Sequence, residues 1–149
     1  MNLIEIAPIR AHLAAAETDL VEIGTARDLG AAKAATIAYP TAWLIALGET
    51  AGPNRYQTHA LVDQRVTATF GVVLAVRDIG DPAGARAVSE AESVRSQVMA
   101  VLGAHVPPGA DSACVPRRGR LVSGIDADGR FFWQDDYAVD FNRRITQET

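Results

Sequence analysis

Apolar and polar residues alternate in one long stretch of the chain, from Gln64 to Arg77. Every second residue is apolar, and the positions between them hold mainly arginine, threonine and small residues. The apolar set is Val66, Ala68, Phe70, Val72, Leu74 and Val76. Because successive side chains of a strand point to opposite faces, this period of two predicts a β-strand with one buried face.

A period of three to four residues follows Asp81 and Pro82 and predicts a long amphipathic helix. Asp81 is expected to cap this helix, with Pro82 at its first position and Gly103 at its end. The apolar face is expected to comprise Ala87 or Val88, then Ala91, Val94, Val98, Val101 and Leu102.

The N-terminal part of the chain shows shorter patterns. Ile6, Ile9 and Leu13 lie at helical spacing and predict a first helix over residues 3–16. The residues after it predict a short strand at 20–23, a short alanine-rich helix at 27–36, a strand at 41–47 and a loop at 48–54.

The C-terminal part predicts a long loop followed by a β-hairpin. Residues 105–116 contain three prolines and one glycine, which is typical of a loop. Residues 120–125 and 130–145 predict two strands, joined by a turn at Asp126–Gly129. Asp135 interrupts an otherwise apolar face of the last strand, formed by Phe131, Trp133, Tyr137, Val139 and Phe141.

This order of elements predicts an α+β fold with a mostly antiparallel sheet, long strands and helices packed on one face. The chain has 149 residues, a length that suits one domain, so a single domain is expected over residues 1–149.

Two predicted strands are longer than such a domain. At the usual rise per residue, the strand at 64–77 would be about 46 Å long and the strand at 130–145 about 53 Å. A compact domain of this size has a diameter of about 38 Å. The strands therefore either bend, at Gly71 and at Asp135-Asp136, or project from the body into a neighbouring subunit.

Composition excludes several classes of protein. Fourteen basic and eighteen acidic side chains give a net charge of −4, which argues against a free-standing nucleic-acid-binding protein. The single Cys114 excludes an intrachain disulfide and a multi-cysteine zinc site. No apolar run approaches 18 residues, and the N-terminus lacks the features of a signal peptide, so neither a membrane span nor secretion is expected.

The candidate chemical residues do not form a recognisable catalytic or metal site. His12, His59 and His105 lack the spacing of metal ligands. Cys114 has Arg117 and Arg118 nearby, an arrangement that would lower the thiol pKa if the cysteine were a nucleophile, but a lone cysteine without a motif is usually a bystander.

The acidic residues near the C-terminus also have an ordinary explanation. The residues Asp126–Gly129 resemble the start of a calcium loop, but they lack its remaining acidic ligands and fit a hairpin turn. Asp135 is expected on the opposite strand face from Asp136 and Asp140, so the three do not form one cluster. We expect no catalytic, cofactor-binding or metal-binding residues and no enzymatic activity.

An ordered set of motifs resembles the tail terminator proteins of tailed bacteriophages, the Mu-type minor tail family, which also occurs in phage-derived particles such as gene transfer agents. The set runs over residues 3–145. It comprises Pro40-Thr41-Ala42-Trp43-Leu44, Gln64-Arg65-Val66 with Phe70 and Val72–Arg77, Asp81-Pro82 with Gly84, Val101-Leu102-Gly103, Gly119-Arg120-Leu121, and Trp133-Gln134-Asp135 with Tyr137, Phe141 and Arg144.

The resemblance implies a structural virion protein without catalytic residues or cofactors. It implies a homohexameric ring that caps the head-proximal end of the tail tube, ends tube polymerisation and gives the surface for head joining. The implied partners are other copies of the chain, the tail tube protein and the head–tail connector, with DNA passing through the lumen without specific binding and no membrane. The resemblance also implies that the protein is located in the virion tail and is assembled in the host cytoplasm.

Two alternatives remain at this point. A head-side neck or tail-completion connector would share the fold and differ in the end to which it binds. A small hydrolase or metal-binding enzyme would need a polar pocket.

Loop length and exposed arginines predict the contact regions with subunits or tube. These regions are the Gly48–His59 loop, the Asp78–Ala83 loop and the Arg117–Arg120 segment. The predicted interface residues are Arg55, Tyr56, Arg65, Arg77, Arg117, Arg118 and Arg120.

Overall fold

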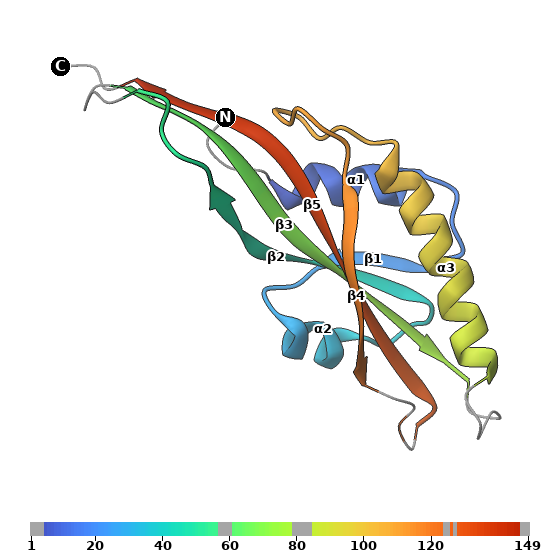
Figure 1. The fold of residues 1–149 in the computed structure, drawn as a ribbon. Coiled ribbons are helices and arrows are strands. Elements are labelled where there is room, and N and C mark those ends of the chain that lie inside the picture. Colours follow the sequence, from blue (N-terminus) through green and yellow to red (C-terminus); the bar gives the residue numbers. More distant parts are fainter. Residues whose placement is uncertain (1–4, 57–60, 79–84, 124–125, 127, 147–149) are drawn as a thin grey trace.

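The computed structural model of the chain describes residues 5–56, 61–78, 85–123, 126 and 128–146. Within them it contains three helices and five strands (Figure 1). In chain order these are α1 (Ile6–Ala15), β1 (Glu22–Thr25), α2 (Leu29–Ala35), β2 (Thr41–Ala51), β3 (Leu61–Arg77), α3 (Ala85–Gly103), β4 (Val115–Ser123) and β5 (Arg130–Thr146).

The strands of the described residues form one sheet in the order β1-β2-β3-β5-β4. β1 runs parallel to β2, and the other neighbouring pairs are antiparallel. β3 and β5, which contain the two long strands predicted from the sequence, lie side by side (Figure 1). The predicted α+β fold with a mostly antiparallel sheet is confirmed.

Helices cover both faces of the sheet. On one face, Leu13 of α1 and Val98 of α3 belong to a core cluster with Phe70 of β3. On the other face, Ala32 of α2 packs in a second cluster with Val73 of β3, so the expectation that all helices lie on one face is wrong for α2. The physical reason lies in the sequence, because β3 is apolar on both faces along 72–76 and its second face must also be covered.

β3 and β5 are paired without interruption from Leu61↔Thr146 to Arg77↔Arg130. No register shift occurs at Gly71, so the alternative of a bulge there is wrong. A Cβ atom on Gly71 would lie 2.9 Å from Nε2 of Gln134, and glycine at this position therefore makes room for a side chain of the neighbouring strand.

β2 continues through residues that the sequence predicted as a loop. The register of β2 against β3 shifts between Ala46 and Gly48, and pairing then continues to Ala51. Gly48 has a φ angle of 145°, a conformation that glycine adopts at low cost. A bulge, and not the end of the strand, explains the glycine at this position.

Two other strand boundaries also differ from the prediction. β1 occupies Glu22–Thr25, displaced toward the C-terminus from the predicted 20–23. β4 begins at Val115, well before the predicted start at Arg120. Pro116 is compatible with β4 because this strand lies at the edge of the sheet.

The predicted helices and the hairpin turn are found. The apolar face of α3 is buried through Ala87, Ala91, Val94, Val98 and Leu102. The expected capping residues Asp81 and Pro82 lie outside the described residues.

In the turn, the carboxylate of Asp126 accepts hydrogen bonds from the backbone N–H of Asp128 and of Arg130, at 3.0 and 2.9 Å. Gly129 has a φ of 75°, the left-handed conformation expected for the turn glycine.

Candidate assembly interface

β3 and β5 extend together beyond the rest of the sheet. The last pair between β2 and β3 is Ala51↔Val66, whereas β3 stays paired with β5 as far as Leu61↔Thr146. We call the extension, residues 61–65 with residues 142–146, the arm. Figure 1 shows the arm projecting from the body at the upper left, away from the three helices.

The segment after β2 runs along the arm. The backbone N–H of Gly52 donates to the carbonyl of Arg65 at 2.7 Å, and that of Arg55 donates to the carbonyl of Asp63 at 2.8 Å. The side chain of Asn54 holds this segment in place, because its Oδ1 accepts from the Asp63 N–H at 2.9 Å and its Nδ2 donates to the Leu61 carbonyl at 3.2 Å. The sequence predicts Asn54 only as the last residue of the loop at 48–54 and does not indicate these hydrogen bonds.

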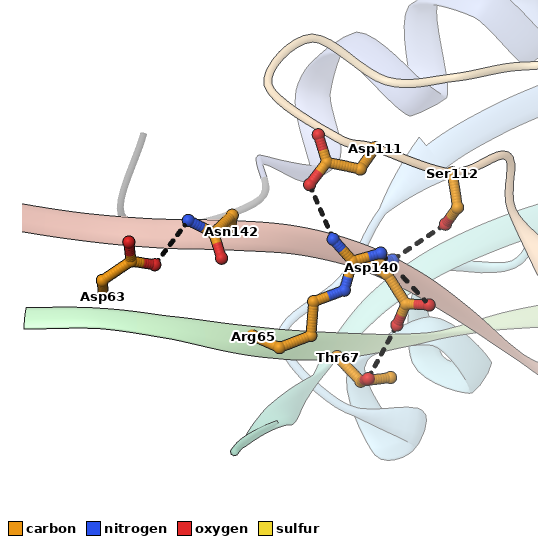
Figure 2. A network of polar contacts seen from close by, with 7 residues as sticks. All are labelled: Asp63, Arg65, Thr67, Asp111, Ser112, Asp140 and Asn142. Atoms are coloured by element: carbon orange, nitrogen blue, oxygen red, sulfur yellow. Dashed lines mark hydrogen bonds and ion pairs between the residues drawn. The ribbon is translucent and has the colours of Figure 1, made fainter. Parts of the chain in front are cut away.

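A network of polar side chains fixes one face of the arm (Figure 2). Nδ2 of Asn142 donates to Asp63 at 2.8 Å, which links β5 to β3 across the arm. Nearer the body, Oγ1 of Thr67 donates to Asp140 at 2.7 Å. Asp63 is buried, so its hydrogen bond to Asn142 compensates for its removal from water.

Arg65 connects this network to the loop before β4. Its guanidinium lies 2.8 Å from the carboxylate of Asp111 and 3.9 Å from that of Asp140 (Figure 2). The backbone of Asp140 is also bound to the loop: its N–H donates to Oγ of Ser112 at 2.9 Å, and its carbonyl accepts from the N–H of Asp111 at 2.8 Å. The root of the arm is therefore held from two directions.

The opposite face of the arm has its own contacts. The guanidinium of Arg143 forms an ion pair with Glu49 of β2 and donates to Oε1 of Gln64 at 3.3 Å. The Arg143 side chain is 15% exposed, whereas the Glu49 side chain is 31% exposed, so water still reaches the carboxylate side of the pair. Anchored on both faces at its root, the arm presents Ile145 as an exposed apolar side chain, and Tyr56 is exposed in the segment beside it.

The predicted interface residues lie in three separate places. Arg55 and Tyr56 lie beside the arm, and Arg65 lies on it. Arg77 lies at the other end of β3, where its Nε donates to the carbonyl of Asp128 at 2.8 Å. The remaining three, Arg117, Arg118 and Arg120, lie on β4.

Comparison with known proteins decides the family. The family model described as "Phage tail terminator protein" matches residues 1–148, nearly the whole chain. The chain belongs to the phage tail terminator family. This is a family of structural proteins of the phage tail, which makes the chain a virion tail component. No curated protein matches the chain.

In this terminator-family chain all three arginines lie on β4, which begins before the predicted strand start at Arg120 and so also contains Arg117 and Arg118. Arg117 and Arg118 are exposed, and within the described part of the chain neither forms an ion pair. Arg120 lies 3.9 Å from Asp136, at the limit of an ion pair. β4 therefore gives the terminator a basic outer edge.

The interruption of the apolar face of β5 by Asp135 is explained by Arg95 of α3. Nε of Arg95 donates to Asp135 at 2.8 Å, and Nε1 of Trp133 donates to the same carboxylate at 3.0 Å. The hydrogen bond to Asp135 raises the pKa of Arg95. The Asp135 side chain is only 3% exposed, so this pair joins the helical layer to the sheet inside the molecule.

The structure shows the surroundings of the side chains that the sequence raised as candidates for catalysis or metal binding. Cys114 is buried, and burial raises its pKa to about 11, so the alternative of a thiol activated by nearby arginines is wrong. As predicted, Asp135 faces away from Asp136 and Asp140. No group of three potential metal-binding side chains occurs among the described residues.

Two of the three histidines form a contact that the sequence did not predict. The rings of His12 on α1 and His105 after α3 are stacked, with centroids 3.8 Å apart and planes 9° from parallel. His59 lies outside the described residues. In the parts of the chain that the structure describes, no helix is long and apolar enough to cross a membrane.

Proposed function

We propose that this chain caps the head-proximal end of a phage tail tube as a hexameric ring. The ring would end polymerisation of the tube protein and give the surface to which the head connector joins. The family match over residues 1–148 carries this proposal.

The arm supports a ring in which each copy contacts the next. A closed ring requires a heterologous contact, in which two different surfaces of the chain meet. The arm is a distinct projecting surface with exposed Ile145 and with exposed Tyr56 beside it, and its hydrogen-bonded root gives it a fixed direction. We propose that it lies against a neighbouring subunit or against the tube.

The predicted interface residues remain part of the proposal. Arg55, Tyr56 and Arg65 would act in the arm contact, and Arg77 at the opposite end of β3. Arg117, Arg118 and Arg120 would act at the β4 edge. Assembly would occur in the host cytoplasm, and DNA would pass through the lumen without specific binding.

The direct test uses purified tail tubes of the same particle. The protein should sediment with tubes, and electron microscopy should show it at one end only. Particles that lack the protein should carry tubes of irregular, excessive length that are not joined to heads. Sedimentation with heads in place of tubes would favour a head-side connector, and binding to neither would contradict the proposal.

Alanine substitutions test the individual residues. Arg55→Ala, Arg117→Ala and Arg118→Ala each remove an exposed guanidinium without disturbing the core. If these side chains contact the ring or tube, tail length or head joining should change. Unchanged tails and normal head joining would remove these positions from the interface.

A further inference from the structure

The sheet has two open edges at its opposite ends. In the order β1-β2-β3-β5-β4, β1 and β4 each have only one neighbouring strand. An open edge presents unpaired backbone donors and acceptors, to which a strand of another molecule can add. Because the two edges differ in sequence, a contact between them in two copies is heterologous and can continue around a ring.

The outer edge of β4 contains a short regular stretch. Register shifts against β5 occur between Pro116 and Arg118 and between Leu121 and Ser123, which leaves the four residues from Arg118 to Leu121 in regular pairing. Arg118 is paired with Asp136, so its side chain lies on the face covered by α2. Leu121 is paired with Trp133, on the face covered by α1 and α3, and is 53% exposed.

The outer edge of β1 has the complementary pattern. β1 also has four residues, beginning with Glu22. Gly24 of β1 faces the ring of Trp43 on the α2 side, and by alternation Glu22 shares that face. Val21 precedes the strand and is 62% exposed.

Charge therefore matches across the two edges. On the α2 side, Arg118 of β4 would meet Glu22 of β1, and neither has an ion pair within the described residues of its own chain. If the strand directions of one sheet continue into the next, the two edges pair antiparallel, and Val21 then lies opposite Gly119. Leu121 lies diagonal to Val21, and both are apolar and largely exposed. Opposite charges and apolar pairs across neighbouring strands stabilise a sheet.

We infer that β4 of one copy pairs with β1 of the next copy, so that the sheets of neighbouring subunits join edge to edge. This inference rests on the proposed ring and names the contact that closes it. Register shifts and proline are also devices by which edge strands avoid pairing, so a β4 edge without a partner strand is the competing outcome. Cross-linking and charge reversal distinguish the two outcomes.

Cysteine cross-linking tests the pairing directly. Within one sheet β1 and β4 are four strand spacings apart, about 19 Å, whereas a disulfide requires Cα atoms within about 7 Å. A disulfide between Glu22→Cys and Arg118→Cys, the two residues that the inferred pairing sets opposite each other, therefore forms only between copies. The chain's own Cys114 is 1% exposed and remains in place.

The double variant E22C/R118C, oxidised at tube ends and in free solution, should give chains of three or more covalently linked copies. The single variants E22C and R118C are the matched controls, and each can give dimers at most. A double variant that caps tubes but yields no species beyond those of the controls would overturn the edge pairing while leaving the proposed function intact. Failure of the wild-type chain to bind tubes would instead contradict the proposed function.

Charge reversal gives a second, independent test. Glu22→Arg makes both edges basic, and Arg118→Glu places an acidic residue on each edge. Each variant alone should cap tubes about tenfold less well than wild type, because like charges then meet. An equimolar mixture should recover capping, because copies of the two variants can alternate around the ring.

Glu90→Arg on α3 is the matched control for charge, since it makes the same change away from both edges. Unfolding midpoints in urea must stay close to wild type for the comparison to count, and the mixture test uses only variants that meet this condition. Wild-type capping by both single variants, or no recovery in the mixture, would overturn the inference.

Discussion

Single residues decide how the helical layer is attached to the sheet. Asp135 is nearly inaccessible to water, and its carboxylate is bound by Arg95 and by the indole of Trp133. A buried carboxylate without these partners would keep its desolvation cost and lose its compensation. The pair therefore matters most when only one of its members is removed.

Arg95→Ala should lower the free energy of unfolding by about 3 kcal/mol, at the low end of the range for buried pairs because Arg95 is 26% exposed. Urea denaturation measures this loss. The double variant Arg95→Met with Asp135→Leu should recover most of it, because no charge is then left buried. A single variant as stable as wild type would show that water reaches the carboxylate.

The stacked histidines predict a dependence of stability on pH. The pKa of His105 is lowered from its ordinary 6.5, first by burial and second by the charge of His12. The unfolded chain therefore takes up this proton at a higher pH than the folded chain does. Stability from this group is complete above the unfolded pKa and is lost as the pH falls toward the folded value.

His105→Phe should reduce the loss of stability between about pH 7.5 and pH 5.5, a range above the titration of most carboxylates. The phenylalanine keeps an aromatic ring to stack on His12. It removes the buried Nε2 of His105, which has no hydrogen-bond partner. Urea midpoints of both chains at the two pH values measure the effect. If the urea midpoints of both chains change equally between the two pH values, protonation of His105 is not linked to unfolding.

At the scale of elements, β4 lies close to the neighbouring side chains because one of its residues is glycine. A Cβ atom on Gly119 would lie 2.7 Å from Oδ1 of Asp135, 2.8 Å from the ring of Trp133 and 2.9 Å from the guanidinium of Arg95. The strand thus covers the buried ion pair directly. Any side chain at this position must displace either β4 or the pair.

Gly119→Ala should therefore destabilise the chain by about 1–3 kcal/mol through overpacking. Thermal unfolding measures the change. Gly103→Ala at the end of α3 is the matched control, because a Cβ atom there would have no neighbour within 4 Å. If the two variants unfold at the same temperature, β4 is free to shift outward.

The sequence predicted some elements well and others poorly, for a physical reason. β3, β5 and α3 were predicted because apolar residues recur at a regular spacing along one face of each, although both faces of β3 are buried along 71–76. The second half of β2 and the start of β4 are exposed on both faces. No hydrophobic period therefore predicts a strand at these residues. The partner of Asp135 lies 40 residues away, and no local pattern indicates it.

At the scale of the whole molecule, the excess length of β3 and β5 over the body was also predictable, since strand length follows from residue number. The choice between bending and projection was not, because it depends on pairing between strands far apart in the sequence. The observed ladder is unbroken, and the arm is its consequence. In the proposed ring, the arm would keep the contacts of assembly apart from the core of the body.

Ile145→Asp at the arm should change the free energy of unfolding by no more than about 1 kcal/mol, as for most exposed positions, yet abolish capping of tail tubes. Sedimentation with tubes and urea denaturation measure the two effects. Ile37→Asp is the matched control, because Ile37 is 86% exposed on the body. Normal capping by the Ile145 variant would place the essential contacts elsewhere.

The position of β5 inside the sheet has a consequence for biosynthesis. β5 lies between β3 and β4 but follows both in the sequence, so β4 has no partner strand while the ribosome is still translating residues 130–146. β5 must also pair with β3, which precedes it by the whole of α3 and β4, and contacts between segments so far apart in the sequence form slowly. If β4 is an assembly edge as inferred, a nascent chain would lack that edge, and copies emerging from the same messenger RNA would be kept from joining prematurely.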